Sequence, residues 1–597
     1  MTAILEHHAP RHGQKFACDT MGFPGPMPPS QRVSKGPPQA RAEAPGIWDG
    51  RVAPWLERWA AVLAVALAAL ACARIVATYE ELSITSDEPA HLAYGLEYWS
   101  GRFYPTEHPP LSRTLMALEP YLEGLRVVKE TDMSADGYAA LAQSAHFDRT
   151  VFWMRLGILP FFVLACWVTY LWTARQFGRA AAALAIAWFT LEPTVLAHAG
   201  LATTDMALTA GVGGAFLSLL LWAETPSWKH AALLGAAWAM AVLSKFTALA
   251  YLPASAVFAL AIWIALRRPA IARLAALVRE RVPTFCGALA VFALLVWAVY
   301  RFSFGSAAPG NLHLPAPAFF TGIADAFGHA KAHPNRSFLL GQVSTGFWYF
   351  FPVVLAVKTP IALLAAAAVG AAVCWRRRAQ GGLLPLALAL GVLLPAMASR
   401  VNIGARHILP VYLVICLLGA LGLIQMARWF RSPAMSLGLP AALLLWMAIS
   451  GARQHPDYLA YFNAFAGDQP DTVLVDSDLD WGQGIRLLSR RLREAHATRL
   501  SALFLQDTKY LPLLARFYQL PPTEPLRERF PAPGWNVLSP TVLRYSPGGA
   551  RLQEHRAAID LEGRRLSSNG PWFDWLPPAE RAGGLLLYNI PPGFEAQ

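Results

Sequence analysis

Long apolar runs separated by short polar links occupy most of the chain between residues 57 and 451. A bilayer core of about 30 Å needs roughly 20 apolar residues per helix, and most of these runs approach that length. They predict eleven membrane-spanning helices, near residues 57–79, 151–173, 180–198, 205–223, 230–247, 248–266, 282–303, 353–375, 383–399, 406–426 and 434–451. The fold class expected from this pattern is a polytopic α-helical membrane protein.

The two flanks of this region have different patterns. The first 50 residues are rich in proline, glycine and charge and lack apolar periodicity, which predicts a disordered tail. After the last run, strand-like stretches at 472–476, 501–505 and 584–590 alternate with a helix-like stretch at 485–495. This alternation predicts a small α/β domain. The expected organisation is a disordered tail, a transmembrane domain and a C-terminal domain, over residues 1–50, 51–451 and 452–597.

Basic residues predict the orientation in the membrane. With the N-terminal tail in the cytoplasm, every link on that side carries Lys or Arg, as the positive-inside rule requires. These residues are Arg175, Arg179, Lys229, Arg267, Arg268, Arg273, Arg279, Arg281, Arg376, Arg377, Arg378, Arg428 and Arg431. The opposite, extracytoplasmic side then holds residues 80–150, 304–352 and 399–407 and the C-terminal domain.

Composition agrees with a membrane protein, because 55% of the 597 residues are hydrophobic and only 15% are charged. The formal net charge of +12 comes mainly from the tail and the links, without a continuous basic face, so it indicates topology and not a nucleic-acid partner. The six cysteines form neither a CxxC metal site nor a disulfide framework.

An acidic pair, Asp87 and Glu88, follows the first run. Pro89 near the first turn, with Leu92 and Leu96 on one face, predicts an amphipathic helix lying on the outer leaflet. One interpretation of the acids is helix capping and stabilisation of the helix dipole, which needs only one of them. The other is that one carboxylate at the membrane surface is a general base that removes a proton from an acceptor hydroxyl.

Four cationic or imidazole side chains lie beside apolar sequence on the same side, namely Lys245, Lys358, Arg406 and His407. A single Lys or Arg near a span end is commonly explained by snorkelling. A leaving phosphate, however, requires positive charge close to the acids, and several cations on the outer side run against the positive-inside bias. Asp205, which opens the fourth span, is either a helix N-cap or a second acid of the same site.

Two further pairs could bind a divalent metal ion or substrate, namely Glu107 with His108 and His329 with His333. Their spacing matches no recognised metal signature. Asp476, Asp478 and Asp480 alternate before Trp481, but the glycine and the distal glutamate of a calcium-binding loop are out of register. A turn or packing motif is the expectation there.

Six motifs carry a family resemblance in the order SDEPAHLAYG, EHPPL, LATTDMALT, LSKFTAL, GFWYFFPVVLAVKTP and NIGARHILPVY, across residues 80 to 415. In this set and order the chain resembles the phospholipid carrier-dependent glycosyltransferases of the GT-C superfamily, related to protein O-mannosyltransferases and the lipid A aminoarabinose transferase. The stretches HPDYLAYFNAFAG and DSDLDWGQG are also similar to bacterial members. Beyond residue 490 the resemblance ends.

The resemblance implies a GT-C fold with a cavity at the outer face of a bacterial inner membrane. It also implies inverting transfer of a sugar from a polyprenyl-phosphate donor to a lipid, glycan or protein hydroxyl. Asp87 would be the base, with Glu88 in support and Asp205 at the second acidic position. The side chains assigned to the donor phosphate are Lys245, Lys358 and Arg406 with His407. The family leaves the sugar and the need for a divalent metal open.

Two alternatives have different signatures. A transporter or flippase of lipid-linked sugars usually has charges at the membrane midplane and repeated halves, whereas these acids cluster at the outer boundary. A transferase of whole glycans would have its long external loop between late spans, whereas here that loop follows the first span.

Overall fold

The computed structural model describes residues 46–592, except for residues 309, 311, 333–335, 379–380, 528–530, 546–571 and 575. Most of the predicted disordered tail therefore lies outside the described residues. The last residues of this predicted tail lie in a short helical turn, η1 (Trp48–Val52), which continues into the first long helix.

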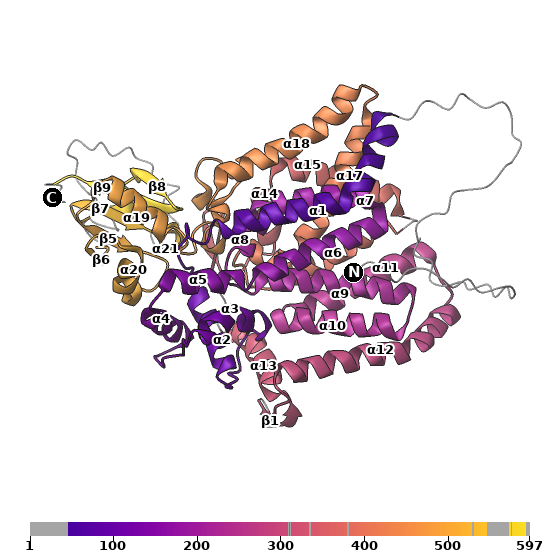
Figure 1. Ribbon diagram of the computed structural model, residues 1–597, viewed down its shortest axis with the longest axis horizontal. Coiled ribbons are helices and arrows are strands. Elements are labelled where there is room, and N and C mark those ends of the chain that lie inside the picture. Colours follow the sequence, from indigo (N-terminus) through magenta and orange to yellow (C-terminus); the bar gives the residue numbers. More distant parts are fainter. Residues whose placement is uncertain are drawn as a thin grey trace, which may run out of the picture.

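A bundle of long helices forms the main body, and Figure 1 shows most of them running along one common direction. Each predicted apolar run falls on one or two of these helices. They are α1 (Ala53–Val76), α6 (Leu159–Phe177), α7 (Arg179–Leu191), α9 (Asp205–Glu224), α10 (Trp228–Ser244), α11 (Ala248–Arg267), α12 (Ile271–Val299), α15 (Ile361–Arg376), α16 (Leu384–Ala398), α17 (Val411–Trp429) and α18 (Pro433–Gln454). Within the described residues, 7 helices are long and apolar enough to cross a membrane, or up to 9 if bent pairs count. The polytopic helical class is confirmed, and the number of eleven spans stays a prediction.

Two of the predicted spans are broken rather than straight. Helix α7 is followed after a bend of 67° by α8 (Pro193–Ala199), and α14 (Phe350–Lys358) by α15 after a bend of 115°. A proline follows each break, and both preceding residues, Glu192 and Thr359, have extended backbone. Proline cannot donate a helical hydrogen bond and disfavours helical conformation in the residue before it, which explains both breaks.

A cluster of shorter helices lies at one end of the bundle. It comprises α2 (Glu88–Trp99), α3 (Leu111–Leu122), α4 (Met133–Gln143) and α5 (Phe147–Leu156). Helix α2 packs against both α3 and α4, so every one of its residues is buried or half-buried. The expectation of a helix lying on the outer leaflet is therefore wrong for α2, because protein covers both of its faces.

Between residues 304 and 344, two short antiparallel strand pairs lie on either side of a helix. The elements are β1 (Phe304–Ala307), β2 (Leu312–Pro315), α13 (Pro317–Ala332), β3 (Ser337–Leu339) and β4 (Gln342–Ser344). Strand β1 pairs with β2, and β3 pairs with β4.

The C-terminal region contains the predicted small α/β domain. A five-stranded sheet has the order β6-β5-β7-β9-β8, in which β5 is parallel to β6 and β7 whereas β9 is antiparallel to β7 and β8. The elements are α19 (Ile485–Glu494), β5 (Leu500–Leu503), α20 (Leu511–Tyr518), β6 (Thr523–Pro525), β7 (Gly534–Leu538), α21 (Pro540–Tyr545), β8 (Glu580–Ala582) and β9 (Leu585–Ile590). The strands predicted near 501–505 and 584–590 and the helix at 485–495 are confirmed.

The strand predicted at 472–476 is wrong. Two 3-10 turns, Pro470–Thr472 and Asp476–Asp478, occupy this stretch. Asp476 has a left-handed backbone (φ 62°), and its carboxylate accepts a hydrogen bond from the Ser477 N–H. Such a local side-chain-to-backbone bond competes with a strand ladder.

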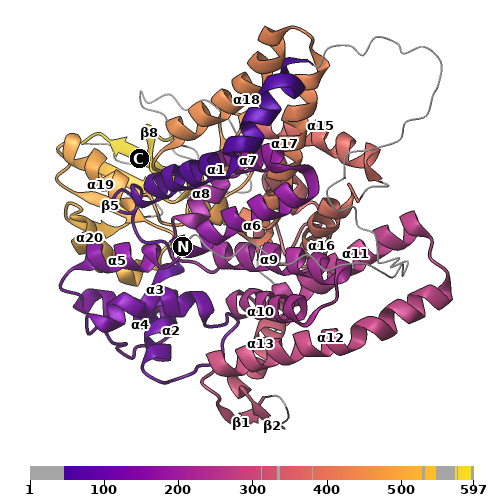
Figure 2. The ribbon, with the colours of Figure 1, turned by 45° about the vertical axis from the view of Figure 1, so that its right-hand side comes forward.

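The C-terminal domain packs on the short-helix cluster, and Figures 1 and 2 both show the two at the same end of the bundle. Residues from α2, α4, α19 and β5 belong to one continuous hydrophobic core. The backbone N–H groups of Ser83 and Ser86 donate to the carbonyls of Gln483 and Trp481, and the Ile84 N–H donates to the Tyr518 hydroxyl. The loop that leads into Asp87 is thus held by the C-terminal domain.

Candidate active site

Asp87 occupies the N-cap position of α2, but its carboxylate accepts a hydrogen bond of 2.8 Å from Arg406 instead of capping the helix. Arg406 lies in a 3-10 turn, η3 (Ala405–Ile408), and its guanidinium stacks 4.2 Å from the centre of the Trp481 ring. The Asp87 side chain is 37% exposed, whereas that of Arg406 is 10% exposed. Asp87 is therefore a reachable carboxylate held by a largely buried cation.

The charge of Arg406 controls the protonation of Asp87. Burial raises the pKa of the carboxyl, but the Arg406 charge and hydrogen bond outweigh burial and hold the pKa below its ordinary value. The nearby negative charge of Asp205 acts in the opposite direction. Asp87 is thus an ionised carboxylate at neutral pH.

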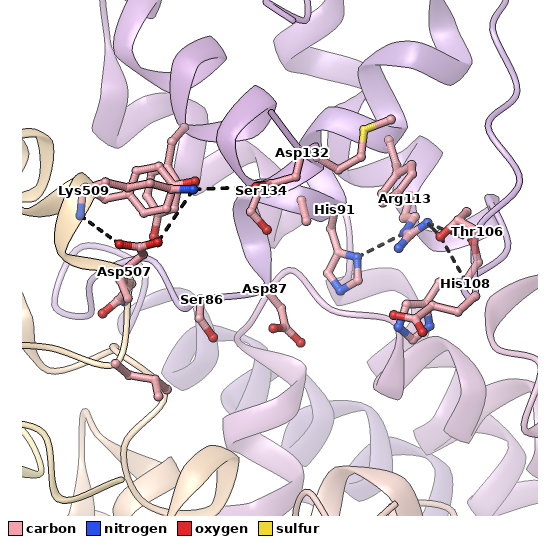
Figure 3. Close-up of a pocket in the computed structure, with 18 of the residues that line it drawn as sticks. Ser86, Asp87, His91, Thr106, His108, Arg113, Asp132, Ser134, Asp507 and Lys509 are labelled. Atoms are coloured by element: carbon pink, nitrogen blue, oxygen red, sulfur yellow. Dashed lines mark hydrogen bonds and ion pairs between the residues drawn. The ribbon is translucent and has the colours of Figure 1, made fainter. Parts of the chain in front are cut away.

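Two cavities meet at Asp87. The first has a volume of about 760 Å³ and the second about 440 Å³, and Ser86, Asp87 and Leu505 line both. The first extends along α2 to the C-terminal domain, as Figure 3 shows with Asp87 between its two ends. The second is lined in addition by Arg336, Ile403, Arg406, Asp476, Trp481 and Tyr545.

One end of the first cavity is built from Arg113 and two imidazoles. Arg113 donates a 3.1 Å hydrogen bond to Nδ1 of His91, and its other hydrogen bonds go to the carbonyl of His108, at 2.9 Å, and to the Thr106 hydroxyl. Burial lowers the pKa of Arg113 to about 10, so it keeps its charge at neutral pH. Burial and the Arg113 charge lower the pKa of His91 to about 3 and that of His108 well below its usual range. The end of the cavity thus has one fixed cation and two neutral imidazoles.

Sequence reasoning overlooked Arg113 and His91. His91 lies inside the quoted motif SDEPAHLAYG, and Arg113 lies two residues after the quoted motif EHPPL. The available signal was the position of Arg113 inside a predicted external segment, although nothing local indicated that it turns toward His91.

Glu88 is a buried structural carboxylate. It forms a bidentate ion pair with Arg155, with nitrogen–oxygen distances of 2.9 and 3.0 Å. It also accepts hydrogen bonds from the N–H groups of Thr85 and Ala202. Both side chains of the pair are 0% exposed. Arg155 also donates to the carbonyls of Leu82 and Ser83. Because its oxygens are occupied in this way, Glu88 fixes the loop before Asp87 and is not placed to react.

Asp205 and Lys245 pair with each other. The Lys245 ammonium lies 2.6 Å from the Asp205 carboxylate, and both side chains are almost completely buried. Asp205 opens α9 but turns to Lys245 rather than capping the helix. Neither residue is among those that line the two cavities in the described structure. They form a buried ion pair whose charges act electrostatically on Asp87 and His108.

Lys358 does not reach either cavity. Its ammonium donates to the carbonyls of Leu459 and Asp478 at 2.7 and 2.6 Å and lies 4.2 Å from the centre of the Phe462 ring. The break between α14 and α15 places this cation inside the protein, 1% exposed. The structure gives it a packing role, joining α14 to the segment after α18.

The remaining candidates are dispersed. Glu107 lines the first cavity, and the His407 carbonyl accepts a hydrogen bond from Tyr251. His333 lies outside the described residues, and only the backbone of His329, in α13, is described. Across the described part of the chain, no group of three or more His, Cys, Asp or Glu side chains could hold a metal ion. Glu107 and His108 thus have no third side chain of these types placed to share a metal ion with them in the described structure, and a metal or substrate role for the pair stays a prediction.

The three alternating aspartates have mostly structural partners. Asp478 accepts from the Ala405 N–H at 2.9 Å, and Asp480 accepts from the Gly482 N–H and the Ser539 hydroxyl. Asp476 lines the second cavity near Arg406, and burial raises its pKa to about 6. The expectation of a turn or packing motif agrees with these contacts.

Comparison with known proteins finds a family similarity over part of the chain. Residues 64–304 match the family model described as dolichyl-phosphate-mannose-protein mannosyltransferase, and no curated protein matches. This matched segment contains Asp87, the Arg113 end of the first cavity and the Asp205–Lys245 pair. Over this segment, which is less than half of the chain, the sequence is similar to that family of membrane glycosyltransferases.

Solved structures with a similar arrangement include ArnT from Cupriavidus metallidurans. Its undecaprenyl phosphate complex is 15% identical, with a TM-score of 0.42 over 80% of this chain and 93% of that chain. Its apo state is 14% identical, with a TM-score of 0.45 over 88% and 97% of the two chains. Archaeal oligosaccharyltransferase AglB from Archaeoglobus fulgidus, in complex with an inhibitory peptide and a dolichol-phosphate, is 12% identical, with a TM-score of 0.42 over 82% and 70%.

Proposed function

We propose that the chain transfers a sugar from a polyprenyl-phosphate carrier to a hydroxyl of a lipid, glycan or protein acceptor, at the extracytoplasmic face of a bacterial inner membrane. The matching family model is named for a dolichyl-phosphate donor, which is a carrier of this chemical class. The single observation that carries the proposal is the position of Asp87, an ionised carboxylate at the junction of two cavities.

In the proposed reaction Asp87 accepts the proton of the acceptor hydroxyl while the hydroxyl oxygen attacks the anomeric carbon. The bond between that carbon and the phosphate oxygen breaks, and the polyprenyl phosphate leaves with the bonding electrons. A single displacement inverts the anomeric configuration. The depressed pKa keeps Asp87 ionised, so the base is ready without a prior proton transfer.

The leaving phosphate gains negative charge and needs cationic and hydrogen-bonding groups. Arg113, with His91 and His108, supplies these at one end of the first cavity. We assign the phosphate to this end, in place of the Lys245 and Lys358 suggested by the resemblance, because Arg113 lines the first cavity whereas those two lysines line neither cavity.

Replacing Asp87 tests the proposal directly. In reconstituted full-length protein supplied with a panel of polyprenyl-phosphate sugars, Asp87→Asn should lower the transfer rate by about 10²- to 10⁴-fold, the usual contribution of a general base. The matched control is Asp468→Asn, at an exposed aspartate outside both cavities. Wild-type rates in the folded Asp87→Asn variant would contradict the base assignment.

A further inference from the structure

The end of the first cavity opposite Arg113 is formed jointly by α4 and the C-terminal domain. Tyr138 comes from α4, and Gln506, Asp507, Lys509 and Tyr510 come from the segment that follows β5. In Figure 3 Lys509 and Asp507 lie on one side of Asp87, and His91, Arg113 and His108 lie on the other. We call this part of the cavity the distal end.

Three polar atoms at the distal end are buried without a hydrogen-bond partner among the described residues. They are the hydroxyl oxygens of Tyr138 and Tyr510 and the side-chain carbonyl oxygen of Gln506. Tyr138 is 2% exposed and Gln506 is 5% exposed. Buried polar groups in folded proteins nearly always have a partner, so three unpaired atoms in one cavity wall indicate a ligand that supplies hydrogen bonds.

The surrounding contacts hold these groups in place. The rings of Tyr138 and Tyr510 stack with their centres 4.0 Å apart, across the joint between α4 and the C-terminal domain. The Gln506 amide donates to the Ile84 carbonyl and lies against Gly482, where a Cβ atom would come within 1.8 Å of the amide nitrogen. Glycine at 482, which also has a φ of +93°, is therefore required for Gln506 to occupy this position.

The sheet topology independently favours a binding role. Strands β5 and β7 are parallel, and the segments after their carboxyl ends line the two cavities. The first cavity is lined by Leu505, Gln506, Asp507, Lys509 and Tyr510, and the second by Tyr545. In open α/β sheets, ligands bind outside the carboxyl ends of parallel strands. The end of the sheet that faces Asp87, where the parallel strands finish, is thus the end expected to bind a ligand.

From this geometry we infer that the distal end binds the acceptor, that the acceptor presents a carbohydrate there, and that the C-terminal domain selects it. Phenol hydroxyls and an amide oxygen match sugar hydroxyls, which both donate and accept hydrogen bonds. An acyl chain in the same place would leave all three atoms unpaired. Lys509, with Asp132 at 3.6 Å and Asp507 at 3.7 Å, adds a charged rim at the mouth. This inference rests on the proposed glycosyl transfer, because Asp87 must then lie between donor and acceptor.

The test uses Tyr138→Phe and Tyr510→Phe, which remove one hydroxyl each and keep the stacked rings. Binding of methyl glycosides to full-length protein in nanodiscs is followed by saturation-transfer NMR, and binding of undecaprenyl phosphate is measured in parallel. Each variant should bind the methyl glycoside with about 3- to 10-fold lower affinity, as expected for one lost hydrogen bond. Its affinity for undecaprenyl phosphate should be unchanged. Tyr461→Phe, at a tyrosine that lines neither cavity, is the control.

Unchanged glycoside affinity in both variants would overturn the inference. So would binding of Ser- or Thr-containing peptides, in place of glycosides, that depends on the same two hydroxyls, because the acceptor would then be a protein. These binding measurements need no sugar transfer, so they are independent of the activity test. A fully active Asp87→Asn variant would refute the proposed reaction, whereas the glycoside affinities would still test the distal end.

Discussion

Arg406 donates a hydrogen bond to Asp87, although the two residues lie 319 positions apart in the chain. The contact joins the start of α2 to the turn before α17. It gives the proposed base a fixed orientation and a depressed pKa at the same time. Both properties can be measured separately from the overall rate.

Removing the Arg406 charge should move the acid limb of the pH–rate profile. Asp87 acts as a base only when ionised, so activity falls as the pH drops through its pKa. Arg406→Gln removes the interaction that lowers this pKa, and the acid limb should shift to higher pH. Arg428→Gln, at an exposed pair with Asp49, is the control. An acid limb that stays in place would show that another group controls it.

Arg113 should determine the affinity for the carrier phosphate. Loss of a hydrogen bond to a charged group costs about 1.5–3 kcal/mol, so Arg113→Gln should weaken undecaprenyl phosphate binding about 10- to 150-fold. Microscale thermophoresis on protein in nanodiscs provides the measurement, with Arg126→Gln as an exposed control. If a folded variant kept its affinity for undecaprenyl phosphate, the phosphate would have to be assigned to the Arg406 side of Asp87.

The Glu88–Arg155 pair should matter for stability rather than for chemistry. Removing one partner of a buried ion pair costs about 3–5 kcal/mol because the other charge stays buried. Glu88→Gln and Arg155→Met should each lower the melting temperature strongly, while the double change should recover part of the loss. If Glu88→Gln instead kept its melting temperature and lost transfer, Glu88 would have to be restored to the reaction.

Lys358 should contribute to stability and not to binding of the carrier phosphate. Lys358→Met leaves the carbonyls of Leu459 and Asp478 without their donor, so the melting temperature should fall while affinity for undecaprenyl phosphate stays at the wild-type level. Thermal unfolding and carrier binding, measured on the same preparation, separate the two effects. A variant with normal stability and weakened carrier binding would support the phosphate role implied by the family resemblance.

The membrane architecture could be predicted because apolar length is a local property. Each predicted span falls on helix, and the strands near 501–505 and 584–590 were recognisable from their short runs of aliphatic and aromatic residues. The breaks at Glu192 and Thr359 were less visible, although the prolines that follow them are local signals. The stretch 472–476 was misread because its aliphatic residues looked like a strand, whereas Asp476 bonds its own neighbour.

Only part of the candidate site could be predicted from the sequence. Asp87 could be singled out, since an acidic pair after a span needs an explanation. The partners of Lys358 and Lys245 could not, because an isolated cation in a sequence looks the same whether it binds phosphate or a buried carbonyl. Pairings such as Arg113 with His91 depend on how α2 and α3 cross, which no local pattern encodes.

The hydrogen bonds between residues 83–86 and residues 481–483 have a consequence for biosynthesis. The loop before the proposed base is made early, but its backbone donors at Ser83 and Ser86 find their partners only after the whole helix bundle and the start of the C-terminal domain have been synthesised. A ribosome-bound chain ending at residue 454 should therefore insert its helices and still lack an ordered loop before Asp87. Such a delay would keep a nascent chain from acting on lipid-linked sugars before it is complete.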